Sequence, residues 1–184
     1  MRIGIDLGGS KISALAFDKD DIAYKKIRRT APRGCYRDTL FAIRDLVYEI
    51  EYSNNECACI GLGMPGAISP ATGLIKNANS AWLIGQPLDR DLQAMLNRPL
   101  RVANDADCFA LSEATDGAAS NESPVFGAIL GTGVGGGLVV KGRLLKGANA
   151  IAGEWGHTPL PRPTAEERPG PRCYCGRHGC VETF

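Results

Sequence analysis

One stretch near the end of the sequence constrains the fold most, because it places a histidine and three cysteines close together. It reads Gly-Glu-Trp-Gly-His over residues 153–157 and Cys-Tyr-Cys-Gly-Arg-His-Gly-Cys-Val-Glu over residues 173–182. Zinc is commonly held by four tetrahedral nitrogen and sulfur ligands, and a Cys3His set completes that shell with no open position. A closed shell indicates a structural metal that folds a loop. Glu154 and Glu182 are not needed as ligands, so we expect the metal-pinned loop to aim them at another group.

Length, composition and charge exclude several classes of protein. At 184 residues the chain fits one domain, or one domain with part of another. Its 44% hydrophobic and 22% charged residues are typical of a globular protein with a packed core. A net charge of +1 gives no electrostatic reason to expect a nucleic-acid partner. We find no signal-peptide pattern and no apolar run of about 18 residues, so we expect a cytoplasmic protein with no membrane partner. Seven cysteines, an odd number, argue against a disulfide framework.

Hydrophobic periodicity predicts strands and helices in alternation, and hence an α/β protein. A glycine-turned β-hairpin is expected over residues 3–17, and the charged residues 18–21 predict a turn into a third strand. Further helices are expected over 36–53, 88–97 and 104–117, and further strands over 58–64, 100–103, 125–130 and 137–140. Cys57 and Cys59 alternate in a strand-like pattern that sends both side chains to one face. They could ligate a metal, but small core residues are the favoured interpretation. The small, polar segment 118–124 predicts a boundary between a first domain, 1–117, and a second, 118–184.

Two glycine-rich turns are candidate phosphate-binding sites. In Asp6-Leu7-Gly8-Gly9-Ser10-Lys11, a carboxylate at a strand end precedes a turn whose N–H groups can form an anion-binding concavity, and the lysine adds positive charge. A plain hairpin turn explains the same residues equally well. The second cluster, residues 131–136, matches G-x-G-x-x-G, but a strand, a turn and a strand are expected after it. Since a dinucleotide-binding loop needs a helix there, we interpret this cluster as a second cradle of the first kind.

A third candidate is the pair Asn104-Asp105, at the junction of an expected strand and an expected helix. Such residues often serve only as helix caps. A carboxylate at the carboxyl end of a strand in an α/β sheet is also a common place for a catalytic base. The two interpretations are balanced on these residues alone.

Taken together, the motifs resemble those of the ROK family (repressor, open reading frame, kinase), and most closely its bacterial fructokinases and mannokinases. The resemblance covers essentially the whole chain and rests on residues 6–11, 63–66, 76–82, 104–105 and 131–136 and on the His/Cys stretch. It implies the α/β, actin-like or hexokinase-like ATPase fold (ribonuclease H-like), here the N-terminal lobe and the first part of the second lobe. Ser10 stands where the family usually has threonine, and it keeps the hydroxyl.

The resemblance implies ATP-dependent phosphorylation of a hexose hydroxyl, with fructose or mannose favoured, Mg²⁺ as cofactor and a structural Zn²⁺. Asp105 would be the general base. Sugar hydroxyls would contact Asn79, Asn104, Asp105, Glu154, His157 and Glu182. Phosphates would be held at Asp6, Gly8, Gly9, Ser10, Lys11, Gly131, Thr132 and Gly133. The zinc ligands would be His157, Cys173, Cys175 and Cys180, and the family pattern favours His157 over the competing His178.

The chain departs from the family in length. Family kinases run to about two full domains, whereas this sequence stops at Phe184, directly after the zinc motif. We therefore expect a full-length kinase, a homo-oligomer such as a dimer, and little turnover from these 184 residues alone. A non-catalytic sugar- and zinc-binding fragment is the main alternative. A sugar-responsive repressor of the same family is disfavoured, because the ATPase hairpin begins at Ile3, where a repressor carries a helix-turn-helix.

Overall fold

The computed structural model describes residues 1–18, 23–131 and 133–184. These residues divide into two compact units, Met1–Asp105 and Ala106–Phe184. Most of the turn expected at 18–21, and Thr132 of the second glycine cluster, lie outside the described residues. The domain boundary predicted after residue 117 stays a prediction.

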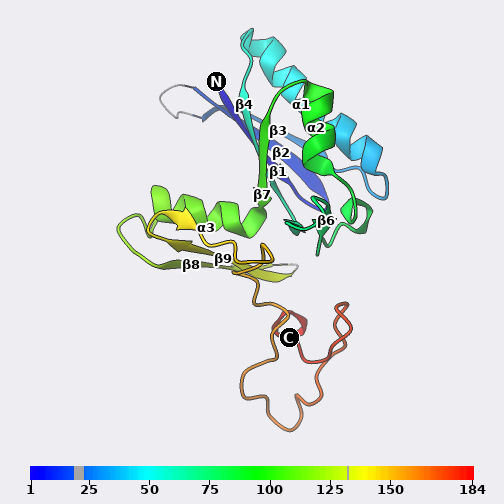
Figure 1. Cartoon of the computed structure of the whole chain (residues 1–184), viewed down its shortest axis with the longest axis vertical. Coiled ribbons are helices and arrows are strands. Elements are labelled where there is room, and N and C mark those ends of the chain that lie inside the picture. Colours follow the sequence, from blue (N-terminus) through cyan, green and yellow to red (C-terminus); the bar gives the residue numbers. More distant parts are fainter. Residues whose placement is uncertain (19–22, 132) are drawn as a thin grey trace. The chain divides into compact units, whose positions relative to one another are not determined.

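The described part of the first unit contains a five-stranded sheet with the strand order β3-β2-β1-β4-β7 (Figure 1). The first three strands pair as antiparallel neighbours, and β4 and β7 run parallel to β1. This confirms the predicted hairpin and the third strand. The strands are β1 (Arg2–Leu7), β2 (Lys11–Phe17), β3 (Ala23–Thr30), β4 (Cys59–Met64) and β7 (Leu100–Asn104).

Helices α1 (Tyr36–Asn54) and α2 (Leu88–Leu96) cover one face of this sheet (Figure 1). α1 has the predicted helical spacing and buries Leu40, Ile43, Leu46, Val47 and Ile50. These side chains share one apolar core with the inward-facing residues of β1, β2 and β4 and with three leucines of α2. Apolar burial on this scale is the main force that holds such a layer together.

The other face of the sheet is more open, and it accounts for one wrong prediction. Cys57 and Cys59 are exposed. In β4, Ile60 and Leu62 point to the helix-covered face and are buried, so Cys59 alternates onto the opposite face. The strand period is as expected, but sequence alone does not show which face the helices cover.

Between β4 and α2 the chain forms a short hairpin that the sequence does not predict. It consists of β5 (Ala67–Ile68) and β6 (Ile75–Lys76), and the 3-10 turn η1 (Ala81–Leu83) follows. Trp82 donates from Nε1 to Oγ1 of the buried Thr39 on α1, at 3.2 Å. This bond fixes the segment after β6 on the helical layer.

In the described part of the second unit, helix α3 (Asp105–Thr115), which starts on the last residue of the first unit, packs on an antiparallel sheet ordered β10-β9-β8. The strands are β8 (Val125–Leu130), β9 (Val134–Val140) and β10 (Arg143–Leu144). A Cβ at Gly137 would lie 2.7 Å from the carbonyl oxygen of Ala106 and 2.8 Å from the Cβ of Ala110, so only glycine lets the helix approach this closely. β9 begins at Val134, within the second glycine cluster, so the chain continues from these glycines as a strand and not as a helix, as expected.

After β10 the described chain is mostly irregular, apart from the turn η2 (Val181–Thr183). Backbone hydrogen bonds nevertheless tie its parts together, including Leu160 N–H to Gly179 O at 2.9 Å and Val181 N–H to Thr158 O at 3.0 Å. Among the described residues, no helix has the length and apolar character needed to cross a membrane.

Candidate functional site

The carboxyl ends of three parallel strands bring predicted site residues to one edge of the first sheet. Asp6 of β1 lies beside Gly63 of β4, and the next residue of β4, Met64, lies beside Asn104 of β7. Asp105 follows directly and begins α3. Ligand sites in open α/β sheets lie outside the carboxyl ends of the strands. This edge therefore gathers Asp6, Asn104 and Asp105 where such a site is expected.

The side-chain amide of Asn104 donates to two oxygens within this edge. Its Nδ2 donates to the carbonyl oxygen of Gly66 at 3.0 Å and to Oδ1 of Asp105 at 3.0 Å. A primary amide has two hydrogens to donate, so both are used inside the chain. The amide thereby orients the Asp105 carboxylate.

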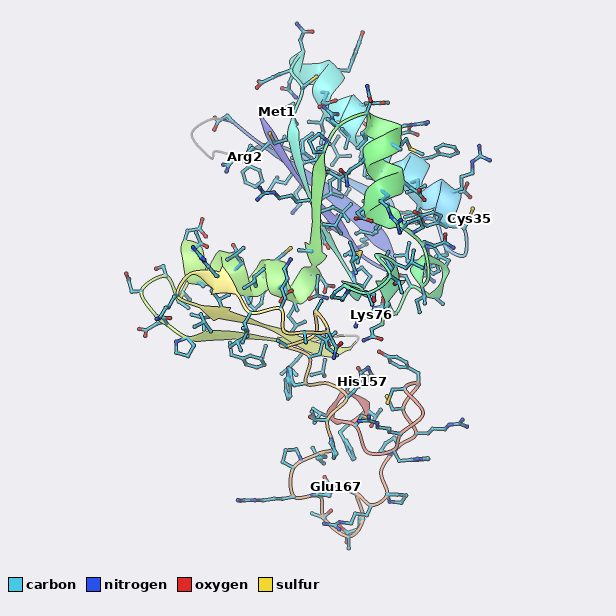
Figure 2. All side chains as sticks on the ribbon, viewed as in Figure 1. Met1, Arg2, Cys35, Lys76, His157 and Glu167 are labelled. Atoms are coloured by element: carbon cyan, nitrogen blue, oxygen red, sulfur yellow. The ribbon has the colours of Figure 1, made fainter. Side chains whose placement is uncertain are left out.

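Gly66 connects this pair to the segment that carries Asn79. It has a φ of +79°, and a Cβ there would lie 2.5 Å from the carbonyl oxygen of Lys76 (labelled in Figure 2) and 2.8 Å from the amide nitrogen of Ala78. No side chain fits in that space, and the positive φ also favours glycine. The exposed Asn79 follows directly, and its Oδ1 accepts from Ser80 Oγ at 3.5 Å.

The first glycine cluster forms the tight turn between β1 and β2. Gly8 N–H donates to Lys11 O at 2.9 Å, and Ser10 O accepts from Ala31 N–H at 3.0 Å. A Cβ at Gly9 would lie 3.6 Å from Ser80 Oγ, so the turn borders the segment of Asn79. The cluster is thus a hairpin turn, and it lies at the edge of the sheet where a phosphate cradle is expected. Phosphate binding at this turn stays a prediction.

In the second unit, the structure gathers the four predicted metal ligands. The ligand atoms of His157, Cys173, Cys175 and Cys180 all lie within 4.8 Å of one another. His157, labelled in Figure 2, belongs to the irregular segment after β10. Backbone hydrogen bonds join residues 158–160 to residues 179–181 and so bring His157 close to Cys180. Within the cysteine segment, Cys173 N–H donates to Arg177 O at 2.8 Å. His178 is exposed and lies outside the cluster.

Two distances within the cluster match those of a tetrahedral zinc site. With Zn–S bonds of about 2.3 Å and Zn–N bonds of about 2.0 Å, the distances between ligand atoms should be roughly 3.5–3.8 Å. Cys175 Sγ lies 3.7 Å from Cys180 Sγ, and Cys173 Sγ lies 3.4 Å from His157 Nδ1. Sulfur and imidazole nitrogen are also the donors that zinc prefers. These residues fit zinc, with Nδ1 as the ligand atom of the histidine.

Without a metal, burial makes two of these thiols hard to ionise. A bond from the backbone N–H of Cys175 lowers the pKa of Cys173, but burial and the neighbouring Glu182 and thiols outweigh it and raise that pKa to about 12. Burial also raises the pKa of Cys180. The more exposed Cys175 has a lowered pKa, chiefly because the backbone N–H of Arg177 donates to its sulfur. Metal binding would therefore release protons from this loop, since zinc takes thiolates.

Both glutamates of the stretch lie beside the second glycine cluster. A Cβ at Gly133 would be 3.7 Å from Glu182 Oε2, and one at Gly135 would be 3.8 Å from Glu154 Oε2. Trp155 Nε1 donates to Gly135 O at 2.8 Å and anchors the loop on β9. The Glu182 side chain is only 8% exposed, so its carboxylate is largely shielded from water. In this unit the metal cluster, the two carboxylates and the glycine turn thus form one group.

The predicted phosphate contacts of this second turn are less defined. Gly131 and Gly133 are exposed, and Gly131 N–H donates to Gly133 O at 2.9 Å, as in a tight turn. Thr132, between them, lies outside the described residues. Phosphate binding here stays a prediction.

Sequence reasoning missed one side chain of this group, Tyr174. Its Oη lies 3.0 Å from Nε2 of His157, on the ring atom opposite the one that faces the cysteines. Partial burial, with the nearby Glu182 carboxylate, raises the pKa of Tyr174 to about 12, so its hydroxyl keeps its proton at neutral pH. A sugar hydroxyl that used the same nitrogen, as predicted for His157, would have to share it with Tyr174 or displace it. No feature of the sequence points to this contact.

The carboxyl edge of the parallel strands and the His/Cys cluster are both features that the resemblance to the ROK family implies. The chain belongs to the ROK family, whose model, described as "ROK family", matches residues 2–184. An N-acetyl-D-glucosamine kinase of Pectobacterium atrosepticum is 40% identical over 188 residues, an alignment that covers 100% of this chain and 62% of that protein.

Two solved structures support the same fold. The ROK hexokinase from Thermus thermophilus superposes with a TM-score of 0.79 at 33% identity, over 98% of this chain and 58% of that one. A ROK family glucokinase from Streptomyces griseus, in complex with glucose and AMPPNP, gives a TM-score of 0.84 at 27% identity, over 100% of this chain and 56% of that one. The chain thus has the predicted actin-like, hexokinase-like fold and spans less than two thirds of these three proteins.

Proposed function

We propose that the protein catalyses ATP-dependent phosphorylation of a hexose hydroxyl, with an N-acetylhexosamine as the favoured substrate. The observation that carries the proposal is the Asn104-Asp105 pair, hydrogen-bonded to each other at the carboxyl edge of three parallel strands. Membership of the ROK family supports a kinase reaction at this edge, because the glucokinase relative was crystallised with glucose and the nucleotide AMPPNP.

The substrate class rests on relatives and not on geometry. The Pectobacterium relative, 40% identical, is named N-acetyl-D-glucosamine kinase. The preference for fructose or mannose suggested by the sequence has no support among the relatives compared above. We therefore favour N-acetyl-D-glucosamine and keep fructose and mannose as competing outcomes of the test.

Asp105 is the proposed general base. Its carboxylate takes the proton from the attacking sugar hydroxyl as the sugar oxygen bonds to the γ-phosphorus, the bond from that phosphorus to the bridging oxygen breaks, and ADP leaves with the electron pair. Phosphoryl transfer depends mainly on alignment and charge neutralisation. Asn104 contributes alignment, because its bond to Gly66 O fixes the amide that in turn holds Asp105 Oδ1. Mg²⁺, placed with the help of Asp6, would supply positive charge at the phosphate oxygens.

We assign the sugar-hydroxyl contacts to Asn79, Asn104, Glu154, His157 and Glu182, with Nε2 of His157 shared between the sugar and Tyr174. Each offers a polar atom suited to a polyol, and a site that leaves such an atom unpaired discriminates strongly against the wrong sugar. The phosphate contacts are assigned to the backbone of the two glycine turns and to Lys11. A structural zinc ion at the His/Cys cluster would fix the loop that carries both glutamates.

The test is a panel of hexoses in a coupled ADP-release assay, using the protein in the form that its gene encodes. We expect the highest kcat/KM with N-acetyl-D-glucosamine. Asp105→Asn should lower kcat by roughly 10²–10⁴-fold without loss of zinc, whereas Asp116→Asn, at an exposed acid just beyond α3, should change little. Full activity of Asp105→Asn would refute the proposed base. Sugar binding by calorimetry with no phosphorylated product would favour the non-catalytic alternative.

A further inference from the structure

The two ring nitrogens of His157 face different partners. Nδ1 lies 3.4 Å from Cys173 Sγ and 3.4 Å from Glu182 Oε1. Nε2 lies 3.0 Å from Tyr174 Oη. A neutral imidazole carries its proton on only one of these atoms, and the other is then the ligand for a metal.

The carboxylate of Glu182 favours the wrong form of the ring for metal binding. A carboxylate oxygen next to Nδ1 accepts a hydrogen bond and so favours a proton on Nδ1, the atom that has to bind the metal. The same oxygen lies 3.3 Å from Cys173 Sγ, so it belongs to the edge of the ligand cluster. Some other group is needed to favour a proton on Nε2.

We propose that Tyr174 is the positioning residue that does this: its hydroxyl oxygen accepts the Nε2–H of His157 and so presents Nδ1 to the metal. The inference rests on the zinc site proposed above. In metal sites generally, the second nitrogen of a ligating histidine donates to an oxygen that fixes the tautomer and the plane of the ring. Such partners are usually carboxylates, backbone carbonyls or water, and here a phenol oxygen takes that place.

The placement of Tyr174 also fixes the ring plane. The two rings meet edge to face, with centroids 5.0 Å apart and an interplanar angle of 84°. Tyr174 lies between the ligands Cys173 and Cys175 in the sequence, so its backbone moves with the cluster. The tyrosine is nevertheless 73% exposed, which means that burial of its side chain is a minor reason for it to lie here.

The experiment compares Tyr174→Phe with Tyr52→Phe. Both variants remove one hydroxyl and keep the ring, but Tyr52 is on α1 in the first unit and is 91% exposed. Zinc affinity is measured by competition with a chromophoric chelator. We expect Tyr174→Phe to bind zinc about tenfold more weakly, at the lower end of the roughly 10–100-fold effects of outer-sphere partners, and Tyr52→Phe to match the parent protein.

A second measurement separates positioning from a general loosening of the loop. In the zinc-loaded protein with ¹⁵N-labelled histidine, NMR should show the His157 Nε2–H proton in the parent, whereas faster exchange with water should broaden it in Tyr174→Phe. Zinc affinity and an Nε2–H signal unchanged in Tyr174→Phe would overturn the inference. A parent protein that binds no zinc at all would overturn the proposed metal site as well, while leaving the kinase proposal to its own assay.

Discussion

Each of the two units of this chain is stabilised in a different way. In the first unit, one continuous apolar core joins the sheet to α1 and α2. In the described part of the second unit, the buried apolar cluster is small, formed by Ala110, Val125 and Val139. In the C-terminal loop of this unit, the buried side chains include two proposed zinc ligands, Cys173 and Cys180. A loop without its own apolar core depends on cross-links, and here backbone hydrogen bonds and the proposed zinc ion supply them.

The predicted site residues differ in the same way, because some lie in the packed first unit or at its edge and others lie near the His/Cys cluster. Asn104 and Asp105 lie where a strand meets a helix, and their geometry follows from packing that needs no ligand. His157 lies on the irregular loop and Glu182 in the short turn η2, and we expect their geometry to depend on the proposed metal. The comparison therefore predicts that metal loss and core damage act on different parts of the molecule.

The largest effect should come from removing one metal ligand. Cys180→Ser replaces a proposed zinc ligand that is 1% exposed, and structural zinc contributes apparent binding energies of about 10–16 kcal/mol in zinc-finger peptides. We expect loss of bound zinc and rapid proteolysis within 153–184, while the urea midpoint of the first unit stays unchanged. Metal analysis and limited proteolysis check this. The control Cys108→Ser, at an exposed cysteine of α3, should retain zinc.

A core deletion in the first unit should have the converse effect. Leu46 is 0% exposed on α1, and Leu46→Ala should lower the free energy of unfolding by about 2–5 kcal/mol. Urea unfolding followed by circular dichroism measures the loss. The zinc content of the folded fraction should equal that of the parent. A loss of zinc in proportion to the loss of stability would contradict the expectation that damage to the first core leaves the metal loop intact.

A smaller effect is expected from a methyl group that crowds the metal loop without touching a ligand. A Cβ at Gly153 would lie 2.2 Å from the carbonyl oxygen of Gly136 on β9. Gly153→Ala should therefore displace the loop, at a cost of about 1–3 kcal/mol, and speed zinc release to a chelator. Gly61→Ala is the matched control, since no heavy atom lies within 4 Å of that position. Equal zinc release from both variants would contradict the role of this contact.

The smallest effect concerns a polar contact at the rim of the first core. Tyr36 on α1 donates to Asp91 Oδ2 on α2 at 2.7 Å, and Tyr36→Phe should lower the free energy of unfolding by about 1 kcal/mol at neutral pH. Burial, helped by the bond to Asp91, raises the pKa of Tyr36 above its usual value. The hydroxyl of Tyr36 therefore makes its full contribution to stability below about pH 10, the pKa expected in the unfolded chain. This contribution is lost as the pH rises from there through the higher pKa of the folded state.

Urea midpoints of the parent and Tyr36→Phe, measured from neutral to alkaline pH, test this sign. Their difference should shrink above about pH 10. Tyr52→Phe, at the 91% exposed tyrosine of the same helix, should follow the parent at every pH. A difference that grew with pH would show that the hydroxyl of Tyr36 is not held protonated in the folded state.

Local patterns predicted most of the regular elements of the fold. The helical spacing of apolar residues in α1 and the apolar runs of β1, β4 and β7 are signals contained in a few consecutive residues. The hairpin of β5 and β6 was missed because strands of two residues are too short to show a period. The exposure of Cys59 was missed because an alternating pattern does not say which face another layer will cover, and Cys57 lies before β4, outside the sheet.

Spacing and residue type were enough to predict the order of the longer helices and strands, the family and the set of residues able to bind a metal. The orientation of those residues depends on tertiary packing. The amide of Asn104 is committed to Gly66, 38 positions away, and the ring of His157 to Tyr174, 17 positions away. Contacts at such separations form only when packing brings distant segments together, so no local pattern in the chain encodes them.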